Sequence, residues 1–480
     1  MVTLGGLIER TAVGPSTPPV MRLVGSAATV VSDVTNDSRA VNSGALFCCV
    51  RGERHDGHDF ATDAVRRGAT ALLVDHELAV PVPQVVAADT RAAMGHLAAS
   101  FHDHPSSAMT VVGITGTNGK TTTAHMLGAI LEKSGTRTAV LGTLTGARTT
   151  PEAPDLQRTL AEERDAGVKA VVMEVSSHAL SLQRVEGMRF AAAVFTNLGH
   201  DHLDFHRTHD AYFAAKASLF TARYAERAII NRDDEHGRKI ASDSNVRVTS
   251  YGRSDADEVR VDATGSTFLW RGARMRCPVG GEFNVVNALA AATTAAELGV
   301  SITDIAAGLE SLSRIPGRFE NVNDHGDFAV IVDYAHTPEA LRNVIEAARA
   351  VTGDGETSRA NARVILVFGC GGDRDPSKRA DMGLSACAAN RIIVTSDNPR
   401  NEDPLAIIAA IVGGVPAAQR QKITVEVDRR RAIEIACGEA LPGDVVVIAG
   451  RGHETMQAIG GTEVPFDDGE VARTVLKGVR

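Results

Sequence analysis

The chain has few aromatic residues, few cysteines and no excess of positive charge. Aromatic side chains make up 4% of its 480 residues and include one tryptophan, so we expect a core of Ala, Val, Ile and Leu. The six cysteines form no Cys-x-x-Cys pair, which favours buried reduced thiols over a disulfide framework or a zinc site. The formal net charge of −9 argues against a protein held to nucleic acid by bulk attraction to phosphates.

Long hydrophobic runs are also missing. No apolar run approaches the ~20 residues of a membrane-spanning helix. No segment near the start of the chain joins basic residues to an apolar run of signal-peptide length. We therefore expect a cytoplasmic monomer that has no membrane partner and no nucleic-acid partner.

Length and composition indicate several globular domains. Hydrophobic residues make up 44% and charged residues 23% of the chain, which is ordinary for folded domains. At ~150 residues per domain, the length predicts about three of them. Residues 102–107 and 315–317 each contain a proline and are linker candidates. We predict domains at residues 1–107, 108–316 and 317–480.

The spacing of apolar residues predicts an α/β fold. Short strand candidates at residues 45–50 and 69–74 indicate a mixed α/β domain at the start. From residue 109 apolar strands alternate with segments of helical spacing, and the alternation restarts after residue 317. Further predicted strands are residues 109–114, 170–175, 191–196, 227–231, 328–332, 363–368, 391–395 and 444–449, and predicted helices are 283–298 and 338–351. In such sheets ligands bind beyond the carboxyl ends of the strands, so those loops should carry the chemistry.

The loop after residues 109–114 has the composition of a phosphate cradle. It reads Thr115-Gly116-Thr117-Asn118-Gly119-Lys120-Thr121-Thr122 and leads into a helical pattern. Glycines let backbone N–H groups approach phosphate oxygens, the lysine reaches the outer phosphates, and a threonine hydroxyl suits Mg²⁺. Ile114 stands where the usual motif has glycine, so this is a variant loop. The alternative is a tight strand-to-helix turn with a surface lysine.

Polar residues follow the next strands. Glu174 ends an apolar strand and suits Mg²⁺, although a helix-capping turn is the alternative. His202, in the loop after residues 191–196, is a candidate contact for a metal or a phosphate, or part of a polar loop. Pattern alone leaves Lys216 on a solvated helix face. Asn284 and Asn287 lie one turn apart, either near a nucleotide or as helix-start residues.

Together these motifs resemble the Mur ligase family, whose ATP-dependent members form amide bonds in peptidoglycan precursor synthesis. The motifs follow the family order over almost the whole chain. They are residues 116–122, 174–178, 200–204, Asn284 with Asn287, 317–320 and 333–338. The resemblance implies an N-terminal UDP-binding domain, a central P-loop ATPase domain and a C-terminal Rossmann-like α/β domain.

The resemblance also implies which ligands the protein binds and which residues would contact each ligand. ATP would contact Gly116, Thr117, Asn118, Gly119, Lys120, Thr121, Thr122, Asn287, Arg318 and Asp333. Mg²⁺ would lie near Thr121, Glu174, His202 and Lys216, with Lys216 carbamylated by CO₂. The implied catalytic residues are Lys120, Glu174, His202 and Lys216. A UDP-muramoyl dipeptide would contact Asn36, Ser38, Thr149, Thr150, Ser176 and Arg184.

A further motif specifies the amine that the resemblance implies. Asp397-Asn398-Pro399-Arg400 is similar to the diaminopimelate motif of family members that use this amino acid. The implied contacts of meso-diaminopimelate are Arg374, Asp397, Asn398, Pro399, Arg400, Gly450 and Glu454. Two arginines suit the distant carboxylate of this substrate, which lysine lacks.

Other functions stay open from the sequence. The same ligase chemistry with L-lysine is one, and an activity like that of folylpolyglutamate synthetase is another. The non-enzymatic alternatives are a nucleotide-dependent switch and a binding scaffold. No Asn-Lys-x-Asp guanine motif supports a switch.

Overall fold

The computed structural model describes residues 2–52, 55–323, 327–352 and 362–478. These residues form two compact units, each built from three stretches of chain. The first unit contains Met1–Gly116, Gly135–Thr196 and Asp210–Ser250. The second unit contains Thr117–Ser134, Asn197–His209 and Tyr251–Arg480. The fold is α/β with several parallel sheets, as the sequence predicts.

The first unit begins with a five-stranded sheet. Its order is β2 (Arg22–Val24), β7 (Gln84–Val86), β6 (Ala71–Val74), β5 (Ala45–Cys48) and β4 (Asp33–Thr35). Strands β4 to β7 are parallel and β2 is antiparallel. Helices α1 (Leu4–Thr11) and α3 (Thr90–Phe101) bury Leu7 and Leu97 with one face of this sheet, and α2 (Ala61–Arg67) buries Ala64 with the other. The loops after β4, β5 and β6 therefore leave from one edge.

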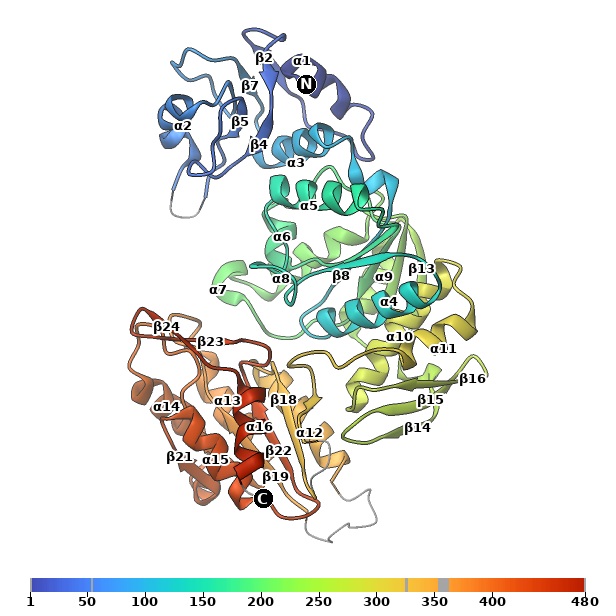
Figure 1. Ribbon diagram of the computed structural model, residues 1–480, viewed down its shortest axis with the longest axis vertical. Coiled ribbons are helices and arrows are strands. Elements are labelled where there is room, and N and C mark those ends of the chain that lie inside the picture. Colours follow the sequence, from blue (N-terminus) through green and yellow to red (C-terminus); the bar gives the residue numbers. More distant parts are fainter. Residues whose placement is uncertain (1, 53–54, 324–326, 353–361, 479–480) are drawn as a thin grey trace. The chain divides into compact units, whose positions relative to one another are not determined.

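A six-stranded sheet forms the rest of the first unit (Figure 1). Its order is β13 (Arg247–Tyr251), β12 (Arg227–Asn231), β11 (Ala192–Phe195), β8 (Thr110–Thr115), β10 (Ala170–Glu174) and β9 (Thr138–Leu141). The pairings from β12 to β9 are parallel. Every residue of β10 is buried, and so is every residue of β8 after Thr110, as strands covered on both faces require. Helix α5 (Ala153–Asp165) packs against α3.

In the second unit, α4 (Lys120–Lys133) packs against two later helices, α10 (Glu282–Glu297) and α11 (Ile302–Glu310) (Figure 1). A Cβ at Gly308 would lie 2.4 Å from the Ile130 Cα, so α11 approaches α4 closely enough to need glycine there. Before α10 the chain forms a small antiparallel sheet of β14 (Asp257–Val261), β15 (Ser266–Trp270) and β16 (Ala273–Cys277).

The second unit ends in a doubly wound sheet, as the renewed alternation predicts. Its order is β17 (Glu320–Asn321), β18 (Ala329–Asp333), β22 (Val445–Ala449), β19 (Val364–Phe368), β20 (Arg391–Val394) and β21 (Ile423–Val425), parallel except for β17. Helices α12 (Pro338–Ala350), α13 (Lys378–Ala386) and α14 (Pro404–Gly413) cover one face, while α15 (Arg429–Glu439) and α16 (Asp468–Gly478) cover the other. A hairpin of β23 (Met456–Ile459) and β24 (Thr462–Pro465) follows β22.

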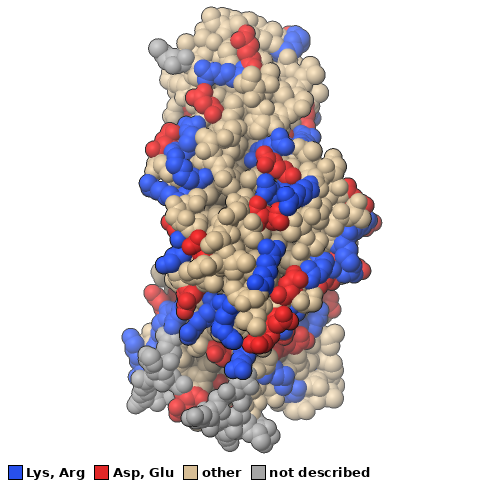
Figure 2. All heavy atoms as spheres, turned by 90° about the vertical axis from the view of Figure 1, so that its right-hand side faces the viewer, with Lys and Arg blue, Asp and Glu red and all other residues tan. Residues whose placement is uncertain are grey.

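The cysteines and the charged surface agree with the composition. All six cysteines are free thiols, and five of them are buried. Figure 2 shows Lys and Arg side chains interleaved with Asp and Glu on the face that it presents. Among the described residues no helix combines the length and the hydropathy needed to cross a membrane.

Candidate functional site

The predicted phosphate loop is hydrogen-bonded to Asn197, which lies shortly after β11. The backbone N–H groups of Thr117 and Asn118 donate to the Asn197 backbone oxygen and to its Oδ1, each at 2.9 Å. Asn197 Nδ2 donates back to the Asn118 carbonyl at 3.2 Å, and the N–H of Gly199 donates to Thr117 Oγ1 at 2.8 Å. Lys120 Nζ donates to the Thr117 carbonyl at 3.0 Å, so the lysine folds back along its own loop.

A glycine rather than a polar cap begins the helix after this loop. Gly119 has φ +84° and is the N-cap of α4, and Thr121 and Thr122 are buried in the first turn. A Cβ at Gly119 would lie 2.4 Å from Asn287 Oδ1. Asn287 Nδ2 donates to Asn284 Oδ1 at 2.9 Å, which holds its amide in place. The sequence left the role of these asparagines open, and the structure puts Asn287 against the phosphate loop.

Arg318 lies beside the same loop. Its Nη2 donates to Thr121 Oγ1 at 3.2 Å, although the two residues are far apart in the sequence. Its guanidinium carbon lies 4.6 Å from the centre of the Tyr334 ring, a cation–π distance. The second unit therefore brings together two residues predicted to contact ATP.

Asp333, at the end of β18, organises the turn that contains Arg318. Its two oxygens accept hydrogen bonds from the N–H of Phe319 at 2.7 Å and from the N–H of Ala335 at 2.8 Å. Burial raises the pKa of the Asp333 carboxyl, against the lowering effect of Arg318. Here Asp333 acts on the backbone that carries Arg318 and Phe319.

His202 belongs to a small charged group that the sequence did not reveal. Its Nε2 lies 3.4 Å from Asp201 Oδ2, and His336 Nε2 lies 3.8 Å from the same oxygen. Burial alone would raise the pKa of Asp201, but the hydrogen bond and charge of His336 and the charge of His202 hold it well below its usual range. His202 itself has φ +55° and a side chain that is 43% exposed. Asp201 and His336 are far apart in the sequence, so only the fold could join them.

In the first unit, Glu174 is a buried carboxylate at the end of β10. Its Oε1 accepts from the Thr143 N–H at 2.8 Å, and its Oε2 accepts from Thr143 Oγ1 at 3.2 Å. A Cβ at Gly142 would lie 2.2 Å from Oε1, so the Gly142–Thr143 backbone is fitted around this carboxylate. Carboxylate and hydroxyl oxygens of this kind are ligands suited to Mg²⁺.

The predicted muramoyl-peptide residues meet around Thr150. Its Oγ1 donates to the Glu174 carbonyl at 2.9 Å and accepts from the Ser176 N–H at 3.1 Å. Arg184 Nη1 donates to the Thr150 carbonyl at 3.1 Å, and Arg184 Nη2 lies 2.6 Å from Glu152 Oε1. Burial lowers the pKa of Arg184, against the raising effect of Glu152.

Of the other predicted muramoyl-peptide residues, Thr149 directly precedes Thr150, whereas Asn36 and Ser38 lie elsewhere in the first unit. Thr149 Oγ1 is 3.1 Å from Thr143 Oγ1, which links Thr149 to the residue that holds Glu174. Asn36 and Ser38 are half-buried in the loop that follows β4, a strand of the five-stranded sheet.

Lys216 is buried, which the helix pattern did not predict. It lies in α8 (His209–Ala217) with 1% of its surface exposed. Its Nζ donates to the Gly116 carbonyl at 2.7 Å and lies 4.6 Å from the centre of the Tyr212 ring. A solvated helix face is therefore excluded, and the side chain points at the first glycine of the phosphate loop.

The predicted diaminopimelate residues converge in the second unit, beyond the carboxyl ends of β19, β20 and β22. Asn398 Nδ2 donates to Glu454 Oε2 at 2.7 Å, and Asn398 Oδ1 accepts from the Ala458 N–H at 2.9 Å. A Cβ at Gly450, where φ is +111°, would lie 2.6 Å from Asp397 Oδ2. Burial raises the pKa of Glu454, and the nearby charge of Asp397 raises it further.

Arg400 and Arg374 both approach the same glycine, Gly371. The position of a Cβ at Gly371 is 3.0 Å from Arg400 Nη1 and 3.6 Å from Arg374 Cγ. Arg400 Nη1 donates to the Gly372 carbonyl at 2.7 Å, and a Cβ at Gly372 would lie 2.0 Å from the Pro399 carbonyl oxygen. The loops after β19 and β20 are therefore in backbone contact.

The two units divide the predicted metal residues. Thr121 and His202 belong to the second unit, while Glu174 and Lys216 belong to the first. Sequence reasoning did not assign a role to Asn197, Asp201 or His336. Each carried a weak signal: Asn197 directly follows the predicted strand at residues 191–196, and Asp201 and His336 lie within the motifs at 200–204 and 333–338.

Three family domains match the chain in order. Residues 30–102 match the Mur ligase family, catalytic domain, and residues 114–295 match the Mur ligase middle domain. Residues 317–452 match the Mur ligase, glutamate ligase domain.

Individual relatives match over nearly the full chain. The UDP-N-acetylmuramoyl-L-alanyl-D-glutamate--2,6-diaminopimelate ligase of Geobacillus kaustophilus is 44% identical and covers 92% of this chain and 94% of its own. The ligase of the same name from Streptomyces coelicolor is 42% identical, with 93% and 92% covered. A solved structure of a ligase with this name has a TM-score of 0.67 and 32% identity, covering 95% of this chain and 96% of its own. MurF from Acinetobacter baumannii has a TM-score of 0.65, 22% identity and coverage of 100% and 98%, which supports the fold alone.

Proposed function

Since this chain belongs to the Mur ligase family and is an ATP-dependent ligase of peptidoglycan precursor synthesis, we propose that it adds meso-diaminopimelate. The acceptor we propose is the D-glutamyl carboxylate of UDP-N-acetylmuramoyl-L-alanyl-D-glutamate. The relatives at 42–44% identity carry the name of this reaction, which supports the proposal.

One observation carries the choice of amine: the convergence of Arg400, Arg374 and Glu454 in the second unit. A guanidinium has five N–H groups, so the bond from Arg400 to Gly372 leaves donors for a carboxylate. Burial and the charge of Asp397 raise the pKa of Glu454, which means that its ionised form is disfavoured. An incoming ammonium group would stabilise that ionised form. A carboxylate and an ammonium on one carbon are what the distant end of diaminopimelate offers and what the side chain of lysine does not.

The proposed reaction has two steps that balance. An oxygen of the D-glutamyl carboxylate attacks the γ-phosphorus of ATP, ADP leaves, and an acyl phosphate forms. The amine of diaminopimelate then attacks the acyl carbon, phosphate leaves with the electrons of the C–O bond, and the amine loses a proton. Two anions meet in the first step, so we assign Lys120 and Arg318 the role of offsetting their charge.

The residues offered for Mg²⁺ have suitable chemistry. Thr121 supplies a hydroxyl oxygen and Glu174 a buried carboxylate, and we propose each as a ligand on its own chemistry, with His202 as a further candidate. Bound Mg²⁺ would neutralise phosphate charge. We also propose that the buried Lys216 is carbamylated, because a carbamate would offer an oxygen anion to Mg²⁺ whereas an ammonium would repel it. A carbamate resonance in ¹³C spectra of protein with ¹³C-bicarbonate, lost in Lys216→Arg, is the expected result.

The other proposed contacts follow the groups described above. Thr149, Thr150, Ser176 and Arg184 would hold the muramoyl peptide, and Asn36 and Ser38 the UDP moiety. Because its substrates include ATP and its thiols are free, we place the reaction in the cytoplasm, with the protein acting as a monomer.

Phosphate release tests the proposal most directly. The purified protein is given ATP, Mg²⁺ and the UDP-muramoyl dipeptide, and diaminopimelate, L-lysine and L-glutamate are added one at a time. We expect release with diaminopimelate only, because lysine would leave an arginine desolvated without its anion, at a cost of about 2–5 kcal/mol. Equal release with lysine would contradict the choice of amine, and release with glutamate would redirect the function to a folate-type ligase.

Arg400→Lys sharpens the same assay. A lysine keeps the charge but loses the planar fork, so kcat/KM for diaminopimelate should fall by at least about tenfold. Arg431→Ala is the matched control, because Arg431 is an exposed arginine of the same unit paired only with Glu434 in the described structure. An Arg400→Lys protein as active as the control would remove Arg400 from the amine site.

A further inference from the structure

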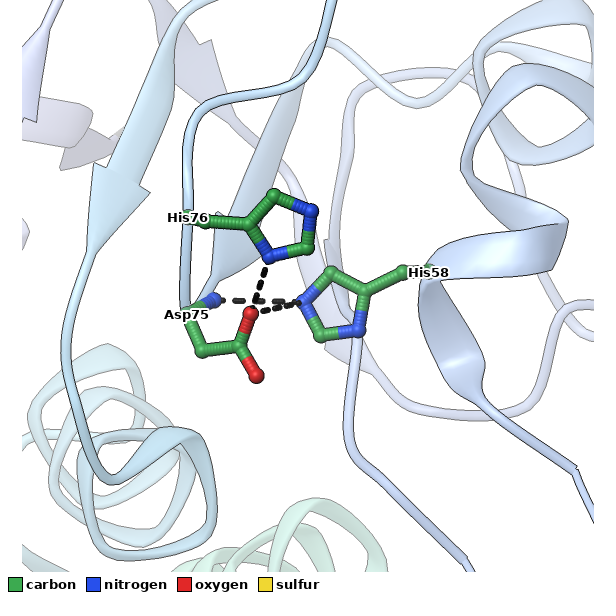
Figure 3. Close-up of side chains that lie close together, drawn as sticks. All are labelled: His58, Asp75 and His76. Carbon is green, nitrogen blue, oxygen red and sulfur yellow. Dashed lines mark hydrogen bonds and ion pairs between the residues drawn. The ribbon is translucent and has the colours of Figure 1, made fainter.

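A second cluster of ligand-type side chains lies in the five-stranded sheet of the first unit. His58 belongs to the short 3-10 helix η1 (Gly57–Phe60) after β5, and Asp75 and His76 directly follow β6. Figure 3 shows the two imidazole rings and the carboxylate turned toward one another. His58 Nε2 or Nδ1, one oxygen of Asp75 and one ring nitrogen of His76 lie within 4.8 Å of one another.

Hydrogen bonds fix the orientation of His58. Its Nδ1 lies 2.5 Å from Asp56 Oδ1, and its side chain is 6% exposed. Its Nε2 accepts from the Asp75 N–H at 3.2 Å. The proton of the neutral ring is therefore assigned to Nδ1, and the lone pair of Nε2 faces Asp75. A carboxylate that fixes an imidazole in this way is the usual outer partner of a metal-binding histidine.

The converging atoms are all electron-pair donors. Asp75 Oδ1 lies 3.2 Å from His58 Nε2 and is also in short contact with His76 Nδ1. The two rings are stacked with their centres 5.0 Å apart. Without an ion, the Nε2 lone pair accepts the Asp75 N–H and a proton on His76 Nδ1 bridges to Asp75 Oδ1, so a bound metal ion would replace both hydrogen bonds. Arg51 Nε bonds only the other oxygen, Asp75 Oδ2, at 2.8 Å, which leaves Oδ1 directed at the rings.

We propose that His58, Asp75 and His76 bind a divalent transition-metal ion, with water completing its coordination. Two imidazole nitrogens and one carboxylate oxygen suit Zn²⁺, Co²⁺ or Ni²⁺ rather than Mg²⁺ or Ca²⁺, which prefer oxygen ligands alone. His76 is 58% exposed, so the ion has a route from solvent.

This site differs from the Mg²⁺ site of the proposed reaction and does not rest on it. Because η1 follows β5 and Asp75 follows β6, the ion would tie together two loops at one edge of a parallel sheet. The loop with Asn36 and Ser38 leaves from the same edge, after β4. We therefore infer that the bound ion would hold the loops after β5 and β6 in place at the edge of the sheet where ligands are expected to bind.

The test is metal titration of the full-length protein without ATP. The protein is stripped with a chelator and titrated with Co²⁺, whose visible absorption reports nitrogen and oxygen ligation, and Zn²⁺ is then added to displace it. We expect one equivalent of Co²⁺ to be lost, or bound at least about tenfold more weakly, in His76→Gln and in His58→Gln. Zn²⁺ should raise the melting temperature of the wild type but not of these variants.

The control is His55→Gln, which removes an exposed histidine three residues from His58 and outside the cluster. It should bind Co²⁺ as the wild type does. His76→Gln carries the conclusion if the buried His58→Gln fails to fold, because His76 is half-exposed. Equal Co²⁺ stoichiometry and affinity in His76→Gln and the wild type would overturn the proposal and leave a proton as the charge shared by these groups.

Discussion

Lys120 shows how little of the local electrostatics depends on the charge of the whole chain. The chain has a formal net charge of −9, yet Lys120 of the phosphate loop bonds the loop's own backbone at 3.0 Å and Arg318 bonds Thr121 beside it. Charges at this range act far more strongly than distant ones screened by salt. Binding of anionic substrates is therefore a property of a few residues.

Lys120→Ala should reduce ATP-dependent phosphate release by at least about 10³-fold, because the charge that offsets two approaching anions is lost. Lys133→Ala is the matched control, since Lys133 is an exposed lysine in the last turn of the same helix. Phosphate release under saturating ATP, with folding checked by circular dichroism, measures both. Near-normal release by Lys120→Ala would remove the loop from the reaction.

His453 makes stability depend on pH. Burial and then the charge of Arg318 lower its pKa from 6.5 to about 4. The unfolded state binds the proton more tightly, so stability is fully present above pH 6.5 and is lost as the pH falls toward 4. Because the ring is only partly buried, we expect the free energy of unfolding to fall by about 2 kcal/mol between pH 7 and pH 4.5. This is less than the full pKa shift of His453 would give.

Urea unfolding at pH 7 and pH 4.5 tests this expectation. His453→Gln should lose about 2 kcal/mol less than the wild type between the two pH values. His55→Gln, at an exposed position, should lose as much as the wild type. An equal loss in all three proteins would show that His453 is not the group responsible.

At the residue scale, the sequence predicted which neighbouring residues share a loop. It did not predict contacts between residues that are distant in the chain. Thr117, Lys120 and Thr121 are adjacent in the chain, so their common loop was predictable. Asp201 and His336 meet only through the fold, and no spacing encodes their contact. Lys216 was predicted to be solvated from its helix pattern, and its burial depends on packing that a single helix does not specify.

At the scale of elements, the apolar runs predicted strands to within a residue or two. The predicted strand at residues 109–114 is β8 at Thr110–Thr115, and the one at 227–231 is β12 at Arg227–Asn231. The ends shift because backbone pairing with β10 and β11, rather than side-chain polarity, decides where β8 stops. Parallel strands place their following loops at one edge, so the likely positions of ligand loops were also predictable.

The loop between β8 and α4 should depend on the missing side chain of Gly119. Gly119→Ala places a Cβ 2.4 Å from Asn287 Oδ1 at a φ of +84° and should abolish ADP binding in calorimetry. Gly135→Ala is the matched control, since Gly135 has φ +87° and nothing within 4 Å of its Cβ position. Backbone strain should cost each variant about 1 kcal/mol of stability, and the contact with Asn287 should add to the loss in Gly119→Ala. ADP binding by Gly119→Ala equal to that of Gly135→Ala would contradict the role of this contact.

At the scale of the molecule, the chain is organised in two interleaved units. The boundaries predicted at residues 107/108 and 316/317 stay a prediction, because the compact units collect non-contiguous segments instead. The chain passes between the units five times. A composition or periodicity analysis reads the chain in order and has no means of detecting such an exchange.

Interleaving should make unfolding cooperative. We expect one calorimetric transition, which ADP at 100 times its Kd raises by about 3 °C, since ~2.7 kcal/mol of binding is spread over a large unfolding entropy. Lys120→Ala should show the same single transition without the ADP shift. Two transitions of which ADP moves only one would contradict the coupling.

The same exchange of segments has a consequence for synthesis on the ribosome. Helix α4 emerges between β8 and β9, but the helices against which it packs, α10 and α11, are translated much later. All segments of the first unit have been translated once Ser250 is added. The helix after the phosphate loop, however, is not covered until Glu282–Glu297 has been made. The helix that follows the phosphate loop is therefore made well before the helices that cover it, and we expect its apolar face to stay exposed during that part of translation.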